Sequence, residues 1–260
     1  MPDTIEFASG LARDTGEMLV EHFCKADFDE TLKIDNSIVT EADLAADRVI
    51  HNAIREKFPN DYILSEEVHS ISPIEHNNPI WIIDPIDGTT NFSLGLHIWG
   101  VLITKLIRGW PVLTAMYFPM LKELFTAQKG AGAYLNNQPI YIKEPNPKKG
   151  TAFFVCCSRT HREYHVTVPY KTRILGSAAY SFCNIARGTA AVAFEAKSKV
   201  WDIAGAWLLV REAGGVIDSY DGPLPFPFRS GIEYQDQNFP TIAAANSHLL
   251  DLTRNQIKPK

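Results

Sequence analysis

The feature that most constrains the fold is a pair of short apolar runs that end abruptly in acidic residues. Residues 62–64 (YIL) lead into Ser65-Glu66-Glu67, and residues 80–83 (IWII) lead into Asp84. Apolar runs of this length, bounded by polar residues, are typical of buried strands. The sequence therefore predicts two strands that carry carboxylates at their ends.

Helical spacing of apolar residues dominates the part of the chain that precedes these runs. The pattern predicts an amphipathic helix over residues 5–23 and a second over residues 40–58, with Pro59 ending the second. The buried stripe of the second helix is expected to contain Leu44, Val49, Ile50, Ala53 and Ile54.

Residues 97–134 are rich in β-branched and aromatic side chains. Arg108-Gly109, Pro119 and Gly130 interrupt them, which predicts an antiparallel meander. Asn136-Asn137 is expected to form a turn.

The polar segment 143–150 (KEPNPKKG) is the best candidate for a boundary between two lobes. We expect an N-terminal lobe over residues 1–145, with helices, the antiparallel sheet and most candidate metal ligands. A C-terminal α/β lobe over residues 146–260 would supply the substrate contacts and Asp202. Strands are expected there near Phe153, Ile174, Val192, Val216 and Ile242, and helices at 178–187, 202–213 and 247–255.

The composition excludes several classes of protein. Of the 260 residues, 45% are hydrophobic and 21% charged, which is ordinary for a globular protein and excludes disorder along most of the chain. The net charge of −5 offers no basic footprint for nucleic acid. The four cysteines lack metal-ligand spacing and are expected to be reduced thiols. Neither a signal peptide nor a membrane helix is recognisable, so we expect a soluble, cytoplasmic protein.

Residues 81–92 (WIIDPIDGTTNF) carry the densest chemical signal. Asp84 ends the buried run, and Asp87 and Gly88 follow shortly after. Carboxylates can hold Mg²⁺, and backbone N–H groups around Gly88, Thr89 and Thr90 can hold a phosphate. Asp-Pro and Asp-Gly are also common turn dipeptides, and Thr is a common N-cap.

Two further acidic sites strengthen the metal interpretation. Glu66 and Glu67 are adjacent like charges, whose repulsion a cation would relieve, although a solvated loop would also explain them. Asp202 stands where a helix is expected to start, so it could serve only as an N-cap.

Together these segments resemble the inositol monophosphatase family, which belongs to the lithium-sensitive, magnesium-dependent phosphatases. The resemblance spans nearly the whole chain. It rests on Glu66-Glu67, on residues 84–92 (DPIDGTTNF), 123–136 (ELFTAQKGAGAYLN) and 201–206 (WDIAGA), and on residues 212–215 (EAGG). It implies an α/β fold, an α-β-α-β-α layered sandwich of the type shared with fructose-1,6-bisphosphatase.

Carried over by position, the resemblance assigns roles to individual residues. The implied metal ligands are Glu66, Asp84, the carbonyl of Ile86, Asp87 and Asp202. Glu66 and Thr89 would activate the attacking water, and Asp43 would orient Thr89. The implied substrate contacts are Asp87, Gly88, Thr89, Thr90, Gly176, Ser177, Ala178, Glu195 and Asp202. Asp43 could instead close a capping box with Thr40, and Glu195 could be a surface residue at a strand end.

The implied activity is hydrolysis of a small phosphorylated alcohol or sugar with two or three Mg²⁺ ions, by in-line attack of water without a covalent phospho-enzyme. Inositol monophosphate is the first candidate substrate, and histidinol phosphate and fructose 1,6-bisphosphate are alternatives. The segment after Phe92 (SLGLHIWG) lacks the Phe-Pro pair common in inositol monophosphatases, which weakens the claim to inositol. The resemblance also implies lithium sensitivity and a homodimer. The non-enzyme alternative is a catalytically silent binding or regulatory homologue.

Overall fold

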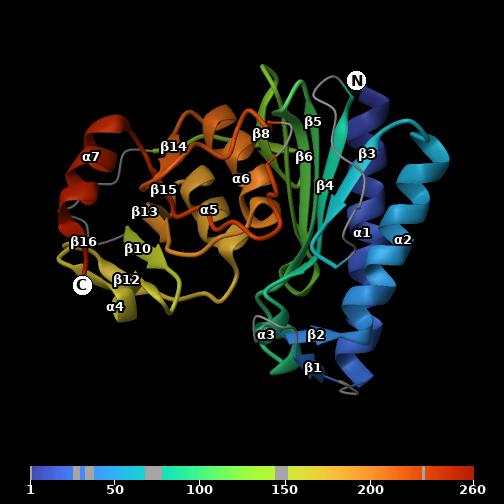
Figure 1. Cartoon of the computed structure of the whole chain (residues 1–260), viewed down its shortest axis with the longest axis horizontal. Helices are drawn as coiled ribbons and strands as arrows, with labels where there is room; N and C mark the ends of the chain where they lie inside the picture. The colour runs from blue at the N-terminus through green and yellow to red at the C-terminus, as the bar shows by residue number, and fades with distance from the viewer. Residues whose placement is uncertain (1, 26–29, 33–37, 68–77, 144–151, 230–231) are drawn as a thin grey trace.

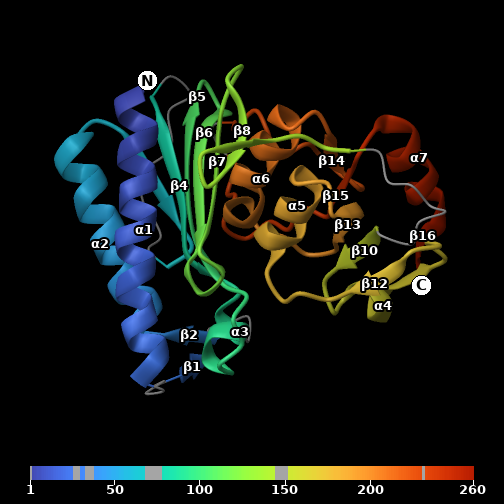
Figure 2. The same ribbon diagram turned by 180° about the vertical axis from the view of Figure 1, so that it is seen from behind.

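The computed structural model describes residues 2–25, 30–32, 38–67, 78–143, 152–229 and 232–260. Their elements stack in five layers, helices alternating with sheets, as Figure 1 shows and Figure 2 repeats from behind. This confirms the predicted α-β-α-β-α sandwich. The proposed linker falls mostly on residues 144–150, which lie outside the described ranges, so the division into two lobes stays a prediction.

Two long helices form one outer layer, α1 (Pro2–Lys25) and α2 (Glu41–Lys57). Both were predicted, but the buried stripe of α2 was partly wrong. Leu44 and Val49 are 39% and 40% exposed. The buried side chains are Ala42, Asp43, Ala46, Asp47, Ile50 and Ile54. They recur every four residues, as one helix face requires. The predicted burial of Ile50 and Ile54 is confirmed, but the rest of this face was not predicted because it includes two carboxylates.

A seven-stranded sheet forms the next layer. Its strands are β3 (Tyr62–Ser65), β4 (Ile80–Asp87), β5 (Gly100–Ile107), β6 (Trp110–Phe118), β7 (Glu123–Gln128), β8 (Gly132–Leu135) and β9 (Gln138–Ile140), in that order across the sheet. Strand β3 is parallel to β4, and the pairs from β4 to β9 are antiparallel. The meander is therefore confirmed. Positive φ angles at Asn136 (49°) and Asn137 (63°) close the β8–β9 hairpin, as expected for a two-residue turn.

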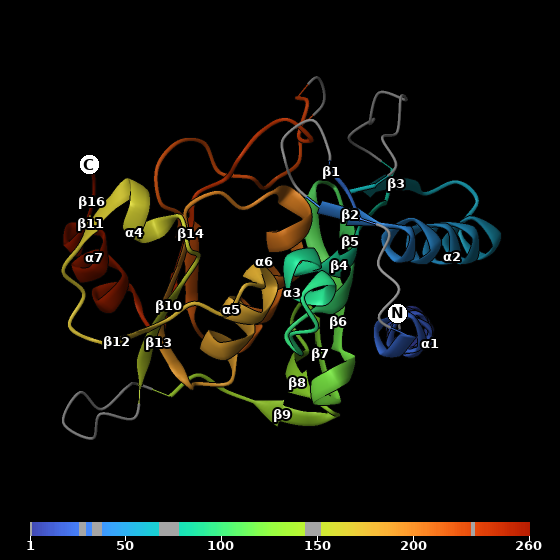
Figure 3. The same cartoon turned by 90° about the horizontal axis from the view of Figure 1, so that it is seen from below.

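Two helices fill the central layer, α5 (Ala178–Ala186) and α6 (Val200–Glu212). Figure 3, seen from below, shows them between the two sheets. Gly205 brings α6 close to the larger sheet, because a Cβ atom there would lie 2.5 Å from Thr114 Oγ1 and 2.9 Å from Thr104 Oγ1. This close packing places the N-terminus of α6 over the end of β4.

The second sheet has five strands in the order β12-β10-β13-β15-β14. They are β10 (Phe153–Cys156), β12 (Lys171–Arg173), β13 (Ala190–Glu195), β14 (Val216–Ser219) and β15 (Thr241–Ala244). Strand β12 ends before Ile174, which is 52% exposed, so the strand expected at Ile174 lies slightly earlier. The last layer contains α7 (Ser247–Gln256) and α4 (Thr160–Glu163).

Short elements complete the fold. These are β1 (Glu30–Leu32) paired with β2 (Ile38–Thr40), α3 (Thr89–Ser93), the 3₁₀ turn η1 (Pro119–Leu121), and β11 (Tyr164–Val166) paired with β16 (Ile257–Pro259).

Candidate active site

The parallel pairing of β3 and β4 brings the two acidic strand ends together. Ser65 is in register with Ile83, and Glu66 N donates to Ile83 O at 3.3 Å. Glu66 and Asp84, the residues that follow Ser65 and Ile83, therefore lie side by side at the same end of the sheet. Both apolar runs are strands, as the sequence predicted. The second strand does not end at Asp84, however, but continues to Asp87 with an irregular register between Asp84 and Asp87.

The third acidic site reaches this edge from the other half of the chain. Carboxylate oxygens of Asp84, Asp87 and Asp202 all lie within 4.8 Å of one another. Asp202 is the third residue of α6, and it also accepts a 2.8 Å hydrogen bond from the backbone N–H of Lys199. The N-cap alternative for Asp202 was wrong, because the N-cap residue is Lys199 and Asp202 is the third residue of the helix. Its carboxylate accepts from the N-cap backbone and also lies in the acidic cluster.

The cluster is electrostatically unfavourable without a cation. Burial raises the pKa of Asp84 well above its ordinary value, and the neighbouring Glu66, Asp87 and Asp202 raise it further. Burial is also the main reason that the pKa of Asp202 is raised, followed by Asp87 and Glu66. Buried carboxylates that repel one another in this way form the kind of oxygen-only donor set that suits Mg²⁺.

Asp87 is held by the N-terminus of α5. Its carboxylate accepts hydrogen bonds from the Ser177 hydroxyl, from Ala178 N at 3.1 Å and from Ala179 N at 3.2 Å. These bonds oppose the effect of burial, which nevertheless raises the pKa of Asp87 to about 6. The segment predicted to contact substrate therefore already binds an acid of the cluster.

The Thr89 hydroxyl, predicted to activate the attacking water, contacts one side chain and one backbone carbonyl. Its Oγ1 is 3.3 Å from Asp43 Oδ1 and 3.0 Å from the carbonyl oxygen of Ile86. The predicted pairing of Asp43 with Thr89 is thus present in the structure. Thr40, the other half of the alternative capping box, has a side chain outside the described part, so that alternative stays untested.

The two glycines predicted to contact substrate both adopt positive φ. Gly88 has a φ of 94° and precedes α3, and a Cβ atom there would lie 3.0 Å from Ile98 O. Gly176 has a φ of 77°, and its Cβ would lie 2.5 Å from Asn91 Oδ1. Thr90 is exposed at the start of α3. The positive φ angles and close contacts at Gly88 and Gly176 require glycine at both positions, whether or not a ligand binds there.

Glu195 is not a surface residue, so that alternative was wrong. It ends β13 and is only 5% exposed. Burial raises its pKa to about 8, and the charge of Asp87 adds to the effect. In the metal-free protein Glu195 therefore holds its proton to a higher pH than an ordinary glutamate does.

The sequence reading missed Asn91. Its Nδ2 donates to Ile98 O at 2.7 Å and to Leu175 O at 2.8 Å, which fastens the loop after α3 to the segment that leads into α5. Its position inside the motif 84–92 was visible, but the two carbonyl partners lie too far along the chain for sequence spacing to reveal them.

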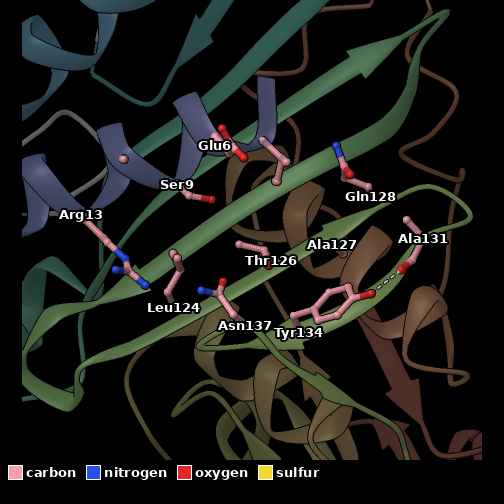
Figure 4. Close-up of a pocket in the computed structure, with 12 residues that line it drawn as sticks. Glu6, Ser9, Arg13, Leu124, Thr126, Ala127, Gln128, Ala131, Tyr134 and Asn137 are labelled. Carbon is pink, nitrogen blue, oxygen red and sulfur yellow. Dashed lines mark hydrogen bonds between the residues drawn. The ribbon is translucent and has the colours of Figure 1, made fainter. Parts of the chain in front are cut away.

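A separate groove lies away from the acidic cluster. It has a volume of about 530 Å³ and lies between α1 and strands β7 and β8. Figure 4 shows Arg13, Thr126, Tyr134 and Asn137 among the side chains that line it. None of its lining residues belongs to the predicted site.

Comparison with known proteins gives a consistent result. The profile of the inositol monophosphatase family matches residues 1–252. A fructose-1,6-bisphosphatase/inositol-1-monophosphatase of Thermotoga maritima is 32% identical over 224 residues, covering 85% of this chain and 86% of that protein. An IMPase structure from the same organism superposes with a TM-score of 0.79 at 26% identity and covers 97% of both chains.

Relatives with other names are equally similar. The Nus factor SuhB of Pasteurella multocida is 32% identical over 238 residues, covering 85% of this chain and 87% of that protein. A histidinol-phosphatase of Chlorobaculum parvum is 32% identical over 237 residues, covering 85% of this chain and 88% of that protein.

No helix in the described ranges has the length and apolarity needed to cross a membrane.

Proposed function

Because this chain belongs to the inositol monophosphatase family, a family of metal-dependent phosphatases, we propose that it is a Mg²⁺-dependent phosphomonoesterase for a small phosphorylated alcohol or sugar. Inositol monophosphate is the first candidate substrate. Histidinol phosphate and fructose 1,6-bisphosphate are the alternatives, because relatives of equal identity carry those names.

The observation that carries the proposal is the uncompensated acidic cluster. Asp84 and Asp87 are 1% and 5% exposed, and their oxygens lie within 4.8 Å of each other and of Asp202. In the described ranges, neither lysine nor arginine forms an ion pair with any of these three acids. Burying charges this close without a counter-ion is costly, so the donor set fits a bound divalent cation.

Mg²⁺ ions, two or three in number, would be held by side chains of Glu66, Asp84, Asp87 and Asp202, with the Ile86 carbonyl as a further ligand. When bound, Mg²⁺ supplies the positive charge that lowers the pKa of a water and stabilises the leaving alkoxide.

The residues around this site would prepare the water for attack. When the Thr89 hydroxyl donates to Asp43, its lone pairs are turned away from that acid and can accept a hydrogen bond from the water. Glu66 would take the proton of the water as it attacks in line with the leaving oxygen. Neither residue forms a covalent bond to phosphorus in this scheme.

On the substrate side, we propose that Glu195, Ser177 and Ala178 recognise the alcohol. A protonated Glu195 can donate a hydrogen bond to a hydroxyl oxygen of the substrate. The Ser177 hydroxyl and the Ala178 N–H donate to Asp87, so they lie next to the acidic cluster. The N–H groups near Gly88, Thr89 and Thr90 would hold the phosphate.

The test is phosphate release from inositol 1-phosphate, histidinol phosphate, fructose 1,6-bisphosphate and adenosine 3′,5′-bisphosphate, with and without Mg²⁺ and with added Li⁺. Asp84→Asn should abolish release, whereas Asp218→Asn should not, because Asp218 pairs with Arg254 and is not one of the three clustered acids. The preferred substrate would identify the branch of the family. A folded protein that releases phosphate from none of them would refute the proposal as stated.

A second candidate is a binding or regulatory role, which the relative named Nus factor SuhB brings into consideration. The two candidates make different predictions for Asp84→Asn. A phosphatase role in cells would be lost in this variant, whereas a pure binding role would survive as long as the chain folds.

We also propose a homodimer in the cytoplasm. Leu94 and Leu96 are 68% and 52% exposed, as is Ile174 at 52%, and Asn91 joins the two loops that carry them. Exposed apolar side chains of this size favour burial in an interface. The thiols of Cys24, Cys156, Cys157 and Cys183 are free, as expected in a reducing compartment. Light scattering of the wild type and of Leu94→Asp tests the dimer.

A further inference from the structure

Helix α2 presents two buried acids to the site one turn apart. Asp43 and Asp47 are each 1% exposed and lie on the same face of the helix, as residues four apart must. Asp43 contacts Thr89, as described above. Asp47 has no assigned role, and its contacts lead to the other end of the site.

The partner of Asp47 is Ser65, the last residue of β3. The Ser65 hydroxyl donates to Asp47 Oδ1, and the backbone N–H of Glu67 donates to Ser65 Oγ at 3.3 Å. The hydroxyl therefore has one defined acceptor and one defined donor, so its orientation is determined. Through it, α2 is joined to the turn that carries Glu66.

This arrangement is costly for folding. Ser65 is fully buried, and within the described part of the chain Asp47 Oδ2 is buried without a hydrogen-bond partner. Leaving a buried carboxylate oxygen without a hydrogen-bond partner typically destabilises a folded protein by more free energy than one hydrogen bond contributes. The neighbouring Ala46 packs on the sheet from the same helix at no such cost, so packing alone does not account for an acid at position 47.

We propose that Asp47 is a positioning residue that holds the turn Ser65-Glu66-Glu67 through Ser65 and thereby aims the Glu66 carboxylate at the acidic cluster. The inference rests on the proposed function, because it takes Glu66 as a metal ligand. Helix α2 then positions both groups proposed to act on the water, Thr89 through Asp43 and Glu66 through Asp47.

The test is direct binding of Mn²⁺, a spectroscopic substitute for Mg²⁺, measured from the electron paramagnetic resonance signal of the free ion. Asp47→Ala should weaken Mn²⁺ binding about 10-fold, as is usual when an outer partner of a metal ligand is lost. Asp47→Asn keeps an acceptor for the Ser65 hydroxyl and should bind within about 3-fold of the wild type. Ser65→Ala removes the hydroxyl alone and serves if Asp47→Ala does not fold.

The matched control is Asp61→Asn. Asp61 is a buried acid just before the other end of β3, where it accepts from Trp81 Nε1 at 2.9 Å and pairs with Lys105 Nζ at 2.7 Å. This variant should lose stability to urea yet bind Mn²⁺ like the wild type. Normal binding by Asp47→Ala and Ser65→Ala would overturn the inference, as would equal weakening in Asp61→Asn.

The two proposals can fail separately. A wild type that binds Mn²⁺ but releases no phosphate refutes the proposed phosphatase function and leaves the positioning role to be decided by the Asp47 variants. A wild type that binds no Mn²⁺ refutes both.

Discussion

The metal-free protein should become more stable when the pH is lowered, contrary to the usual behaviour of proteins with paired carboxylates. Asp84, Asp87 and Asp202 all have pKa values raised above those of an unfolded chain, chiefly by burial. Between the unfolded and the folded pKa the folded state binds more protons. Its stability therefore falls as the pH rises through the folded pKa and is recovered as the pH falls.

Asp87 alone illustrates the size of the effect. A pKa of about 6, against an ordinary value of 3.8, costs the metal-free protein about 3 kcal/mol once Asp87 is fully ionised. Lowering the pH from about 7.5 to about 5.5 returns about 0.8 kcal/mol of this through Asp87 alone. Asp84 and Asp202 act in the same direction. For a chain of this size each kcal/mol shifts Tm by about 2 °C.

The assay is thermal unfolding in excess chelator across this pH range, repeated with saturating Mg²⁺. We expect Tm of the metal-free protein to rise by about 2 °C or more toward pH 5.5. The Mg²⁺-induced rise in Tm should shrink over the same range, because bound metal requires ionised carboxylates. His51, whose pKa burial lowers, opposes the trend.

Asp84→Asn separates the two contributions, since it keeps His51 and removes one acid of the cluster. Its metal-free form should be more stable than the wild type near neutral pH and should depend less on pH. A metal-free wild type whose Tm falls toward pH 5.5 in parallel with that of Asp84→Asn would refute the reasoning.

Three further outcomes follow from the structure. Thr89→Ala should lower kcat about 100-fold, because it removes a hydroxyl that acts on the water, and should keep Mn²⁺ affinity within a few-fold of the wild type. An equal loss of kcat and of Mn²⁺ affinity would contradict this. Gly205→Ala should lower the free energy of unfolding, measured in urea, by about 2 kcal/mol, because the added methyl group pushes α6 away from the sheet. The same shift should move Asp202 and weaken Mn²⁺ binding, and an unchanged affinity would show that α6 does not shift. Lys105→Ala should destabilise the protein by about 3 kcal/mol by leaving Asp61 buried and unpaired, without changing Mn²⁺ affinity.

Much of the site could be predicted because Glu66 and Asp84 directly follow short apolar runs in the sequence. The runs at residues 62–64 and 80–83 are strands, and their parallel pairing explains why Glu66 and Asp84 meet. Asp202 is far away in sequence, and only the family resemblance placed it with the others. Neither periodicity nor composition predicts that α6 packs across the end of β4.

The unpredicted parts depend on tertiary contacts between polar side chains. Asp47 was overlooked because a carboxylate on an amphipathic helix is normally assigned to the solvent face. The same assumption put Leu44 and Val49 inside, where Ala42 and Ala46 lie instead. Asn91 has a similar explanation, since its two acceptors belong to segments that only the folded chain brings together.

The packing of α6 also has a consequence for the order of folding during synthesis. One continuous core joins buried side chains of the seven-stranded sheet to those of α5 and α6. A nascent chain that has emerged only as far as β9 therefore has no cover for the inner face of its largest sheet. It also lacks Asp202. Stable structure and a complete cation site must therefore arise together, late in translation, and truncation before α6 should leave an aggregation-prone fragment even though it contains most of the acidic motif.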